Sequence, residues 1–259
     1  MALITCPECG KKISSKASFC VNCGCPAKEW KSDLTYAEIG DVIEFGSYFR
    51  TKYKQKLPIE WIVLNRQAVS NEASKLLLVS KYALDCKPYN KRDEGITWEE
   101  SALRTWLNGD FYDSAFNAQE QSAIALTDVL ADANPRNNTD SGNDTTDKVF
   151  LLSIDDAEKY FASDKDRKCA PTEYAIAQGA LTSEVYWVDG KYVYTQSGGS
   201  SDIYWVDGKP TCCWWLRSPG ASSICAASVC SDGSVSHLGD YVDYGGSAIR
   251  PAMWITHEA

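Results

Sequence analysis

The stretch from Cys212 to Ile255, CCWWLRSPGASSICAASVCSDGSVSHLGDYVDYGGSAIRPAMWI, organises the rest of the chain. Large apolar side chains stand at both ends, around Trp214-Trp215 and around Met253-Trp254, and each end also carries an arginine, Arg217 or Arg250. The run between them consists mostly of small and polar residues. This contrast predicts a framework at the two ends that holds a displayed, weakly packing segment between them.

Around Val229 and Val235 apolar residues recur at every second position, the pattern of half-buried strands. Asp232-Gly233 between them indicates a hairpin turn, because type I′ turns need positive φ. With Ala227 and Val229 facing inwards, the outward positions form one connected surface. An ordinary solvent-facing sheet rim also explains this spacing. The outward positions are Ser222, Ile224, Cys225, Ser228, Cys230, Ser231, Ser234, Ser236, His237, Leu238, Asp240, Tyr241, Asp243 and Tyr244.

The motif WWLRSPG, the Ser/Gly/Asp/Tyr-rich run after it and the closing IRPAMWI resemble an uncharacterised bacterial domain family. Its members include variable proteins of diversity-generating retroelements. The resemblance extends from about Tyr36 onward and includes the block TWEESALRTWLN at residues 97–108. It implies a C-type-lectin-like α+β fold, with short antiparallel strands and two or more helices. It also implies that residues of about 221–248 form a variable region on a ligand-binding face.

In such retroelement systems, adenine-directed mutagenesis rewrites Asn-type codons near the C-terminus. Randomising the first two bases of these codons cannot produce Lys, Glu, Gln, Met or Trp. None of these five residue types occurs between Ala221 and Ile249, although Lys, Glu and Trp are plentiful elsewhere. This absence is the fingerprint expected of a diversified segment.

The chain has 259 residues and a formal net charge of −9, enough length for one sizeable domain and a small module. The acidic balance argues against direct binding of nucleic acid or an anionic membrane by the main domain. No apolar run reaches membrane-spanning length, and MALITCPECG does not have the form of a signal peptide. We therefore expect a cytoplasmic protein without a membrane span.

Four of the eleven cysteines have the spacing of a zinc site, because Cys6 with Cys9 and Cys20 with Cys23 form two CxxCG knuckles. This arrangement resembles the short zinc ribbons common at bacterial N-termini. Four thiolates would close a tetrahedral structural Zn²⁺ site that leaves no open position for catalysis. A redox or disulfide role is the alternative. Cys25 is an extra thiol next to the site, or a substitute ligand.

We expect a zinc ribbon over residues 1–27, a linker over 28–35 and a C-type-lectin-like ligand-binding domain over 36–259. The first strands of this ligand-binding domain are predicted at residues 40–48, 59–67 and 75–85. A capping box at Thr97 and Glu100 predicts a helix that ends at Asn108-Gly109, with Arg104 as a partly buried structural cation.

Further along the chain, residues 131–147 form a long polar stretch that predicts a solvated loop. The apolar run at residues 149–153 predicts a buried strand, followed by a helix capped by Ser153, and Pro171 precedes another short helix. Asp189-Gly190 and Asp207-Gly208 predict two hairpin turns, and residues 197–201 predict a flexible tip.

Three functions compete. The first is a binding module that holds an unknown protein or glycan on the outward positions, with Tyr241 and Tyr244 as anchors, because Tyr supplies rigid contact area at low entropic cost. The second is an enzyme related to formylglycine-generating enzymes. The adjacent Cys212 and Cys213 point to opposite faces of a strand, and the sequence offers no convincing nucleophile–base pair. The third is a regulatory or scaffold protein that acts through its zinc ribbon. We favour the binding module, and we expect no catalytic residue.

Overall fold

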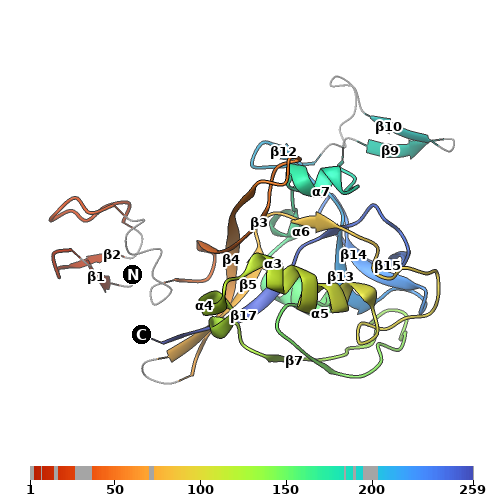
Figure 1. Cartoon of the computed structure of the whole chain (residues 1–259), viewed down its shortest axis with the longest axis horizontal. Helices are drawn as coiled ribbons and strands as arrows, with labels where there is room; N and C mark the ends of the chain where they lie inside the picture. The colour runs from red at the N-terminus through yellow and green to blue at the C-terminus, as the bar shows by residue number, and fades with distance from the viewer. Residues whose placement is uncertain are drawn as a thin grey trace.

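The computed structural model describes residues 3–6, 8–14, 17–26, 37–69, 73–183, 185–188, 191–194 and 204–258. The predicted linker and the predicted tip at residues 197–201 lie outside these residues. The described chain has a mixed α+β fold with mostly antiparallel strands, as the sequence predicts (Figure 1). No helix among the described residues is long and apolar enough to cross a membrane.

Two sheets form the body of the molecule (Figure 1). All neighbouring strands in them are antiparallel except β13 and β16, which run parallel. In order across the sheet, the four-stranded sheet contains β17 (Ala252–Glu258), β5 (Ala73–Ser80), β4 (Lys56–Ala68) and β3 (Val42–Phe49). The five-stranded sheet contains β15 (Val235–Tyr241), β14 (Cys225–Val229), β13 (Trp214–Pro219), β16 (Ala248–Ile249) and β6 (Asp85–Cys86).

Shorter elements surround the two sheets. The two-stranded ladders are β1 (Leu3–Thr5) with β2 (Lys12–Ser14), β7 (Thr127–Val129) with β8 (Thr145–Asp147), β9 (Val185–Val188) with β10 (Lys191–Tyr194), and β11 (Trp205–Val206) with β12 (Lys209–Pro210). The helical segments are α2 (Ala102–Trp106), the π-helix η2 (Leu107–Phe111), α3 (Tyr112–Ala115), α4 (Ala118–Ala123), α5 (Ile154–Tyr160), α6 (Asp164–Arg167) and α7 (Glu173–Ala177).

The segment IRPAMWI joins the two sheets. Ala248 pairs with Trp214 in the five-stranded sheet, and from Ala252 onward the chain pairs with β5 in the four-stranded sheet. Arg250 stands at the crossing and is fully buried. Its guanidinium donates to the carbonyls of Ser80 (2.9 Å) and Arg167 (3.1 Å) and lies 5.0 Å from the centre of the Trp214 ring. The carbonyls and the aromatic ring replace the water that a buried cation loses.

The predicted helix start and end near residues 97–109 are both wrong. The N-cap is Ser101, whose hydroxyl accepts from the amide of Arg104 at 3.1 Å, and the helical stretch continues through η2 and α3 to Ala115. Asn108 does not end the helix, because its side chain bonds to another segment: its Oδ1 accepts from the amide of Lys148 at 2.8 Å. A π-turn at this position accommodates that contact.

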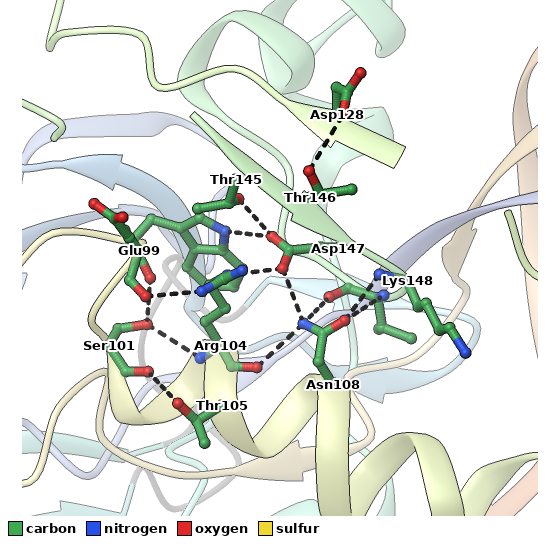
Figure 2. A network of polar contacts seen from close by, with 12 residues as sticks. Glu99, Ser101, Arg104, Thr105, Asn108, Asp128, Thr145, Thr146, Asp147 and Lys148 are labelled. Atoms are coloured by element: carbon green, nitrogen blue, oxygen red, sulfur yellow. Dashed lines mark hydrogen bonds and ion pairs between the residues drawn. The ribbon is translucent and has the colours of Figure 1, made fainter. Parts of the chain in front are cut away.

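The buried carboxylate of Asp147 ties this helix to β8 (Figure 2). Asp147 is 1% exposed and accepts from the Arg104 Nε at 2.7 Å, the Thr145 hydroxyl at 2.7 Å and the Trp98 indole at 3.0 Å. Asn108 adds a longer contact of 3.3 Å. The prediction that Arg104 is a partly buried structural cation is confirmed, and the structure shows that both the Asp147 carboxylate and the Glu99 carbonyl hold it.

We expect Asp147→Asn to lower the free energy of unfolding by about 2 kcal/mol. The substitution replaces one acceptor oxygen with an NH₂ group that faces buried donors, and an unpaired buried polar group costs about 1–3 kcal/mol. Urea unfolding measures the change. Asp128→Asn is the matched control, since Asp128 lies on the paired strand β7 but is exposed, and a similar loss in both variants would contradict this role.

Several local predictions are confirmed. Ser153 caps α5 in a capping box with Asp156, Thr172 caps α7, and positive φ angles at Asp207 and Gly208 form the turn between β11 and β12. The strands on either side of residues 189–190 pair as β9 and β10, while the turn itself lies outside the described residues. Residues 149–152 are buried, as predicted, but form a single bridge between Phe150 and Ala252 and no strand of a sheet.

Candidate functional site

Two features are candidates for function, and the first is the cysteine cluster beside β1 and β2. The sulfur atoms of Cys6, Cys9, Cys20 and Cys23 all lie within 4.8 Å of one another. Cys6 and Cys23 approach to 3.6 Å, and Cys9 and Cys20 to 3.7 Å. A tetrahedral ion with metal–sulfur bonds of about 2.3 Å needs sulfur–sulfur distances of about 3.8 Å. The four cysteines can therefore bind a metal ion.

The local backbone prepares these thiols for a metal. The amide of Gly10 donates to the carbonyl of Cys6 at 2.9 Å, and that of Gly24 donates to the carbonyl of Cys20 at 2.8 Å, so each knuckle closes in the same way. Burial raises the pKa of the Cys20 thiol, but the backbone amides of Asn22 and Cys23 and the Cys23 and Cys6 side chains outweigh it and lower the pKa to about 6. The neighbouring thiols raise the pKa of Cys23 to about 12, so without a metal the cluster shares its protons unequally. A thiolate is the form that binds metal.

The second feature is the hairpin of β14 and β15 that the pattern around Asp232-Gly233 predicts, but the turn is not of type I′, because only Gly233 of this pair has a positive φ. Val229 pairs with Val235, and the amide of Gly233 donates to the carbonyl of Cys230 at 2.8 Å. Gly233 has φ +89°, and a Cβ there would lie 1.8 Å from the carbonyl oxygen of Asp164. The turn therefore requires glycine both for its backbone angle and for its contact with α6.

A bulge that the sequence does not reveal interrupts the hairpin. Ala226 pairs with Asp240, and Ser228 pairs with Ser236, so the residues from His237 to Gly239 stand opposite Ala227 alone. Gly239 has φ +72°, and a Cβ there would lie 2.1 Å from the carbonyl oxygen of Ala226. The bulge turns Leu238 outwards, and its side chain is 67% exposed.

The fourteen predicted binding residues differ in how exposed their side chains are. Four are exposed: Ser222, Leu238, Tyr241 and Asp243. Eight are half-buried: Ile224, Cys225, Cys230, Ser231, Ser234, Ser236, Asp240 and Tyr244. Tyr244 also packs against the apolar core. Two are buried: Ser228 and His237.

The prediction that Ser228 and His237 face solvent is wrong. Ser228 is 1% exposed because both faces of β14 are covered, as the burial of the adjacent Ala227 and Val229 shows, and its hydroxyl donates to Asp240 at 3.2 Å. His237 is 6% exposed, and its Nε2 lies 3.7 Å from the Glu158 carboxylate of α5. Successive side chains of a strand point to opposite faces, so His237 lies on the face opposite to that of its neighbour Ser236.

Nine of the remaining twelve residues lie at two ends of the hairpin. The loop end contains Ser222, Ile224, Cys225, Leu238, Tyr241 and Asp243, and the turn end contains Cys230, Ser231 and Ser234. Of the other three, Ser236 and Asp240 lie along β15, and Tyr244 packs against the core. Pairing of Cys225 with Tyr241 and a 2.9 Å bond from the Ala221 amide to the Leu238 carbonyl hold the loop end together. The five residues of β14 separate the two ends by roughly 15 Å. The fourteen positions therefore do not form one continuous patch.

Asn134 is a residue of this region that the sequence analysis missed. The polar loop around it is not simply solvated, since Asn134 is 1% exposed. Its Nδ2 approaches the carbonyls of His237 at 2.7 Å, Pro219 at 2.9 Å and Gly220 at 3.1 Å. The side-chain amide of Asn134 therefore binds the loop to the bulge of β15. A lone asparagine among many polar loop residues gives no sequence signal for such a contact.

Fold and site together define a mixed α+β domain with an exposed hairpin end and a separate cluster of four cysteines. Residues 73–257, more than half of the chain, match the model of a family described as "Domain of unknown function (DUF6273)". The chain belongs to this family. No curated protein and no solved structure matches it significantly.

Proposed function

We propose that this protein binds a macromolecular ligand, a protein or a glycan, through the loop end of the β14–β15 hairpin, and that it is not an enzyme. The observation that carries the proposal is the exposure of two large side chains there. Leu238 is 67% and Tyr241 59% exposed, next to the small or acidic Ser222 and Asp243. Exposed apolar and Tyr side chains among small polar residues are typical of protein recognition surfaces.

The support beneath this end is rigid. At this end Pro219 of β13 pairs with Ala226, and the buried Asn134 donates to the carbonyls of Pro219, Gly220 and His237. A surface on a packed framework loses little conformational entropy when it binds a ligand, so a larger part of the contact energy contributes to affinity. The residue types that randomised Asn codons cannot produce are absent from this segment. We therefore propose that it is the variable region of a C-type-lectin-like protein diversified by a retroelement.

We propose that the ion held by the four cysteines is Zn²⁺. Four thiolates in two CxxCG knuckles with near-tetrahedral sulfur spacing suit zinc, and they leave no open coordination position for a substrate. The role of this site would then be structural, and binding of the macromolecular ligand would not require it.

The double variant Leu238→Ala/Tyr241→Ala is expected to weaken ligand binding by at least tenfold, because truncating central anchors costs about 1–2 kcal/mol or more each. Arrays of purified bacterial surface proteins and of glycans, probed with the wild-type chain, identify the ligand, and titration calorimetry measures the loss. Tyr244 is unsuitable for truncation, since it packs against the core.

Trp205→Ala is the matched control, because Trp205 is a large side chain of similar exposure (51%) on the separate β11–β12 hairpin. An unchanged affinity in the double variant would contradict the proposed surface. Loss of binding only after deletion of residues 1–27 would favour a scaffold function of the cysteine cluster. A reverse transcriptase gene and a template repeat beside this gene would support diversification, and their absence would argue against it.

A further inference from the structure

Two cysteines meet where β13 and β14 approach the hairpin turn. Trp215 pairs with Ser228 and Trp214 with Val229, so the next residues on this register, Cys213 and Cys230, stand opposite each other. Their side chains are close enough for each thiol to shift the pKa of the other. Directly opposed residues of antiparallel strands have Cα atoms about 4.5–5.5 Å apart. Disulfides need about 4.4–6.8 Å, so the backbone already has the spacing that a disulfide requires.

The two thiols differ in character. The nearby Cys213 and Ser234 side chains lower the pKa of Cys230 to about 7, against the opposing effects of burial and of the Asp232 and Asp240 carboxylates. The same contact and burial raise the pKa of Cys213. Cys230 is therefore the more acidic thiol of the two. A thiolate beside a thiol is the arrangement of a nucleophilic and a resolving cysteine.

Cys212, the residue before Cys213, is not an alternative partner for Cys230. Cys212 points to the other side of the strand, where it is fully buried and donates to the carbonyl of Cys169 at 3.5 Å. Cys213 and Cys230, in contrast, are only half-buried and accessible to a small oxidant. The turn around Cys230 is held by its own amide bond to the Ser234 carbonyl (2.8 Å) and by the Thr211 hydroxyl on the Ser231 carbonyl (2.7 Å).

We propose that Cys213 and Cys230 are a reversible dithiol–disulfide site that hydroperoxides oxidise. The Cys230 thiolate attacks the peroxide, the O–O bond breaks, and Cys230 becomes a sulfenic acid with release of hydroxide or an alkoxide. The Cys213 thiol then attacks the Cys230 sulfur, and the oxygen leaves as water with the thiol proton. The two sulfurs together lose two electrons and the peroxide gains them. A low-molecular-weight dithiol reverses the reaction. This inference does not depend on the identity of the macromolecular ligand.

The test is peptide mapping of the full chain after brief treatment with hydrogen peroxide and blocking of free thiols. Trypsin places Cys213 in a peptide of residues 192–217 and Cys230 in a peptide of residues 218–259, because Lys209 and Arg250 each precede proline. We expect these two peptides to become cross-linked with loss of two hydrogens, and dithiothreitol to separate them. Fragmentation of the cross-linked pair identifies the joined cysteines, so the wild-type result does not depend on a variant that folds.

Cys230→Ala and Cys213→Ala are expected to abolish the cross-link, and Cys225→Ala, the matched control in the same peptide as Cys230, is expected to retain it. In the reduced protein, alkylation of Cys230 by iodoacetamide should rise with pH around a midpoint near 7, and Cys213→Ala should move this midpoint upwards. Further oxidation of Cys230 without a cross-link, or a cross-link that persists in Cys230→Ala, would overturn the proposal.

Discussion

Replacing Cys20 with serine is expected to unfold the described segment up to Pro26 and to leave the melting of the main domain nearly unchanged. The apolar core of this segment consists of Cys6, Ile13, Cys20 and Cys25, too few residues to stabilise a fold without a metal. A structural zinc site contributes about 10–16 kcal/mol to the folding of small zinc modules, and this energy is lost when a ligand is removed.

Metal analysis and limited proteolysis measure the effect. Wild-type protein purified without chelator should contain one zinc per chain, and Cys20→Ser should contain almost none and be cleaved before Pro26. Cys25→Ser is the matched control: Cys25 is buried beside the site but outside the cluster, so its loss should leave the metal content unchanged. A metal-free wild-type protein, or a Cys20→Ser variant with full metal content, would show that the cluster has another role.

Trp215→Ala is expected to destabilise the main domain by about 3–5 kcal/mol, the cost of truncating a buried aromatic side chain. Trp215 is fully buried, and its indole donates to the Lys87 carbonyl at 3.0 Å. Its ring stands edge-on to Tyr89 at 5.9 Å. Alanine would leave a cavity under the face of β13 and an unpaired buried carbonyl.

Thermal unfolding should show a fall in Tm on the order of 10 °C for a domain of this size. Trp205→Ala is again the control, because half of the Trp205 side chain is exposed and little packing is lost there. Trp254 is only half-buried, so Trp254→Ala should cost less than Trp215→Ala. Equal destabilisation by Trp205→Ala and Trp215→Ala would show that the packing around β13 does not support the hairpin.

Features encoded by short-range spacing were predicted from the sequence. The two CxxCG knuckles bring four thiols together, the Asp-Gly pairs at residues 207–208 and 232–233 form turns, and Ser153 caps α5. In each case the interacting groups are at most a few residues apart within a knuckle, turn or cap. The local backbone angles therefore decide most of the geometry.

Contacts between distant segments required the tertiary structure. The sequence did not show that Arg250 crosses between two sheets, that Asn134 holds the bulge of β15, or that Cys213 faces Cys230. It also placed Ser228 and His237 on the outward face, whereas both are buried. The reason is that side-chain alternation has a period of two, a bulge shifts this alternation in β15, and packing on both faces of β14 buries the residues of either face. Local sequence patterns determined the turns, the helix cap and the cysteine cluster. The register of the strands determined which side chains the β14–β15 hairpin exposes.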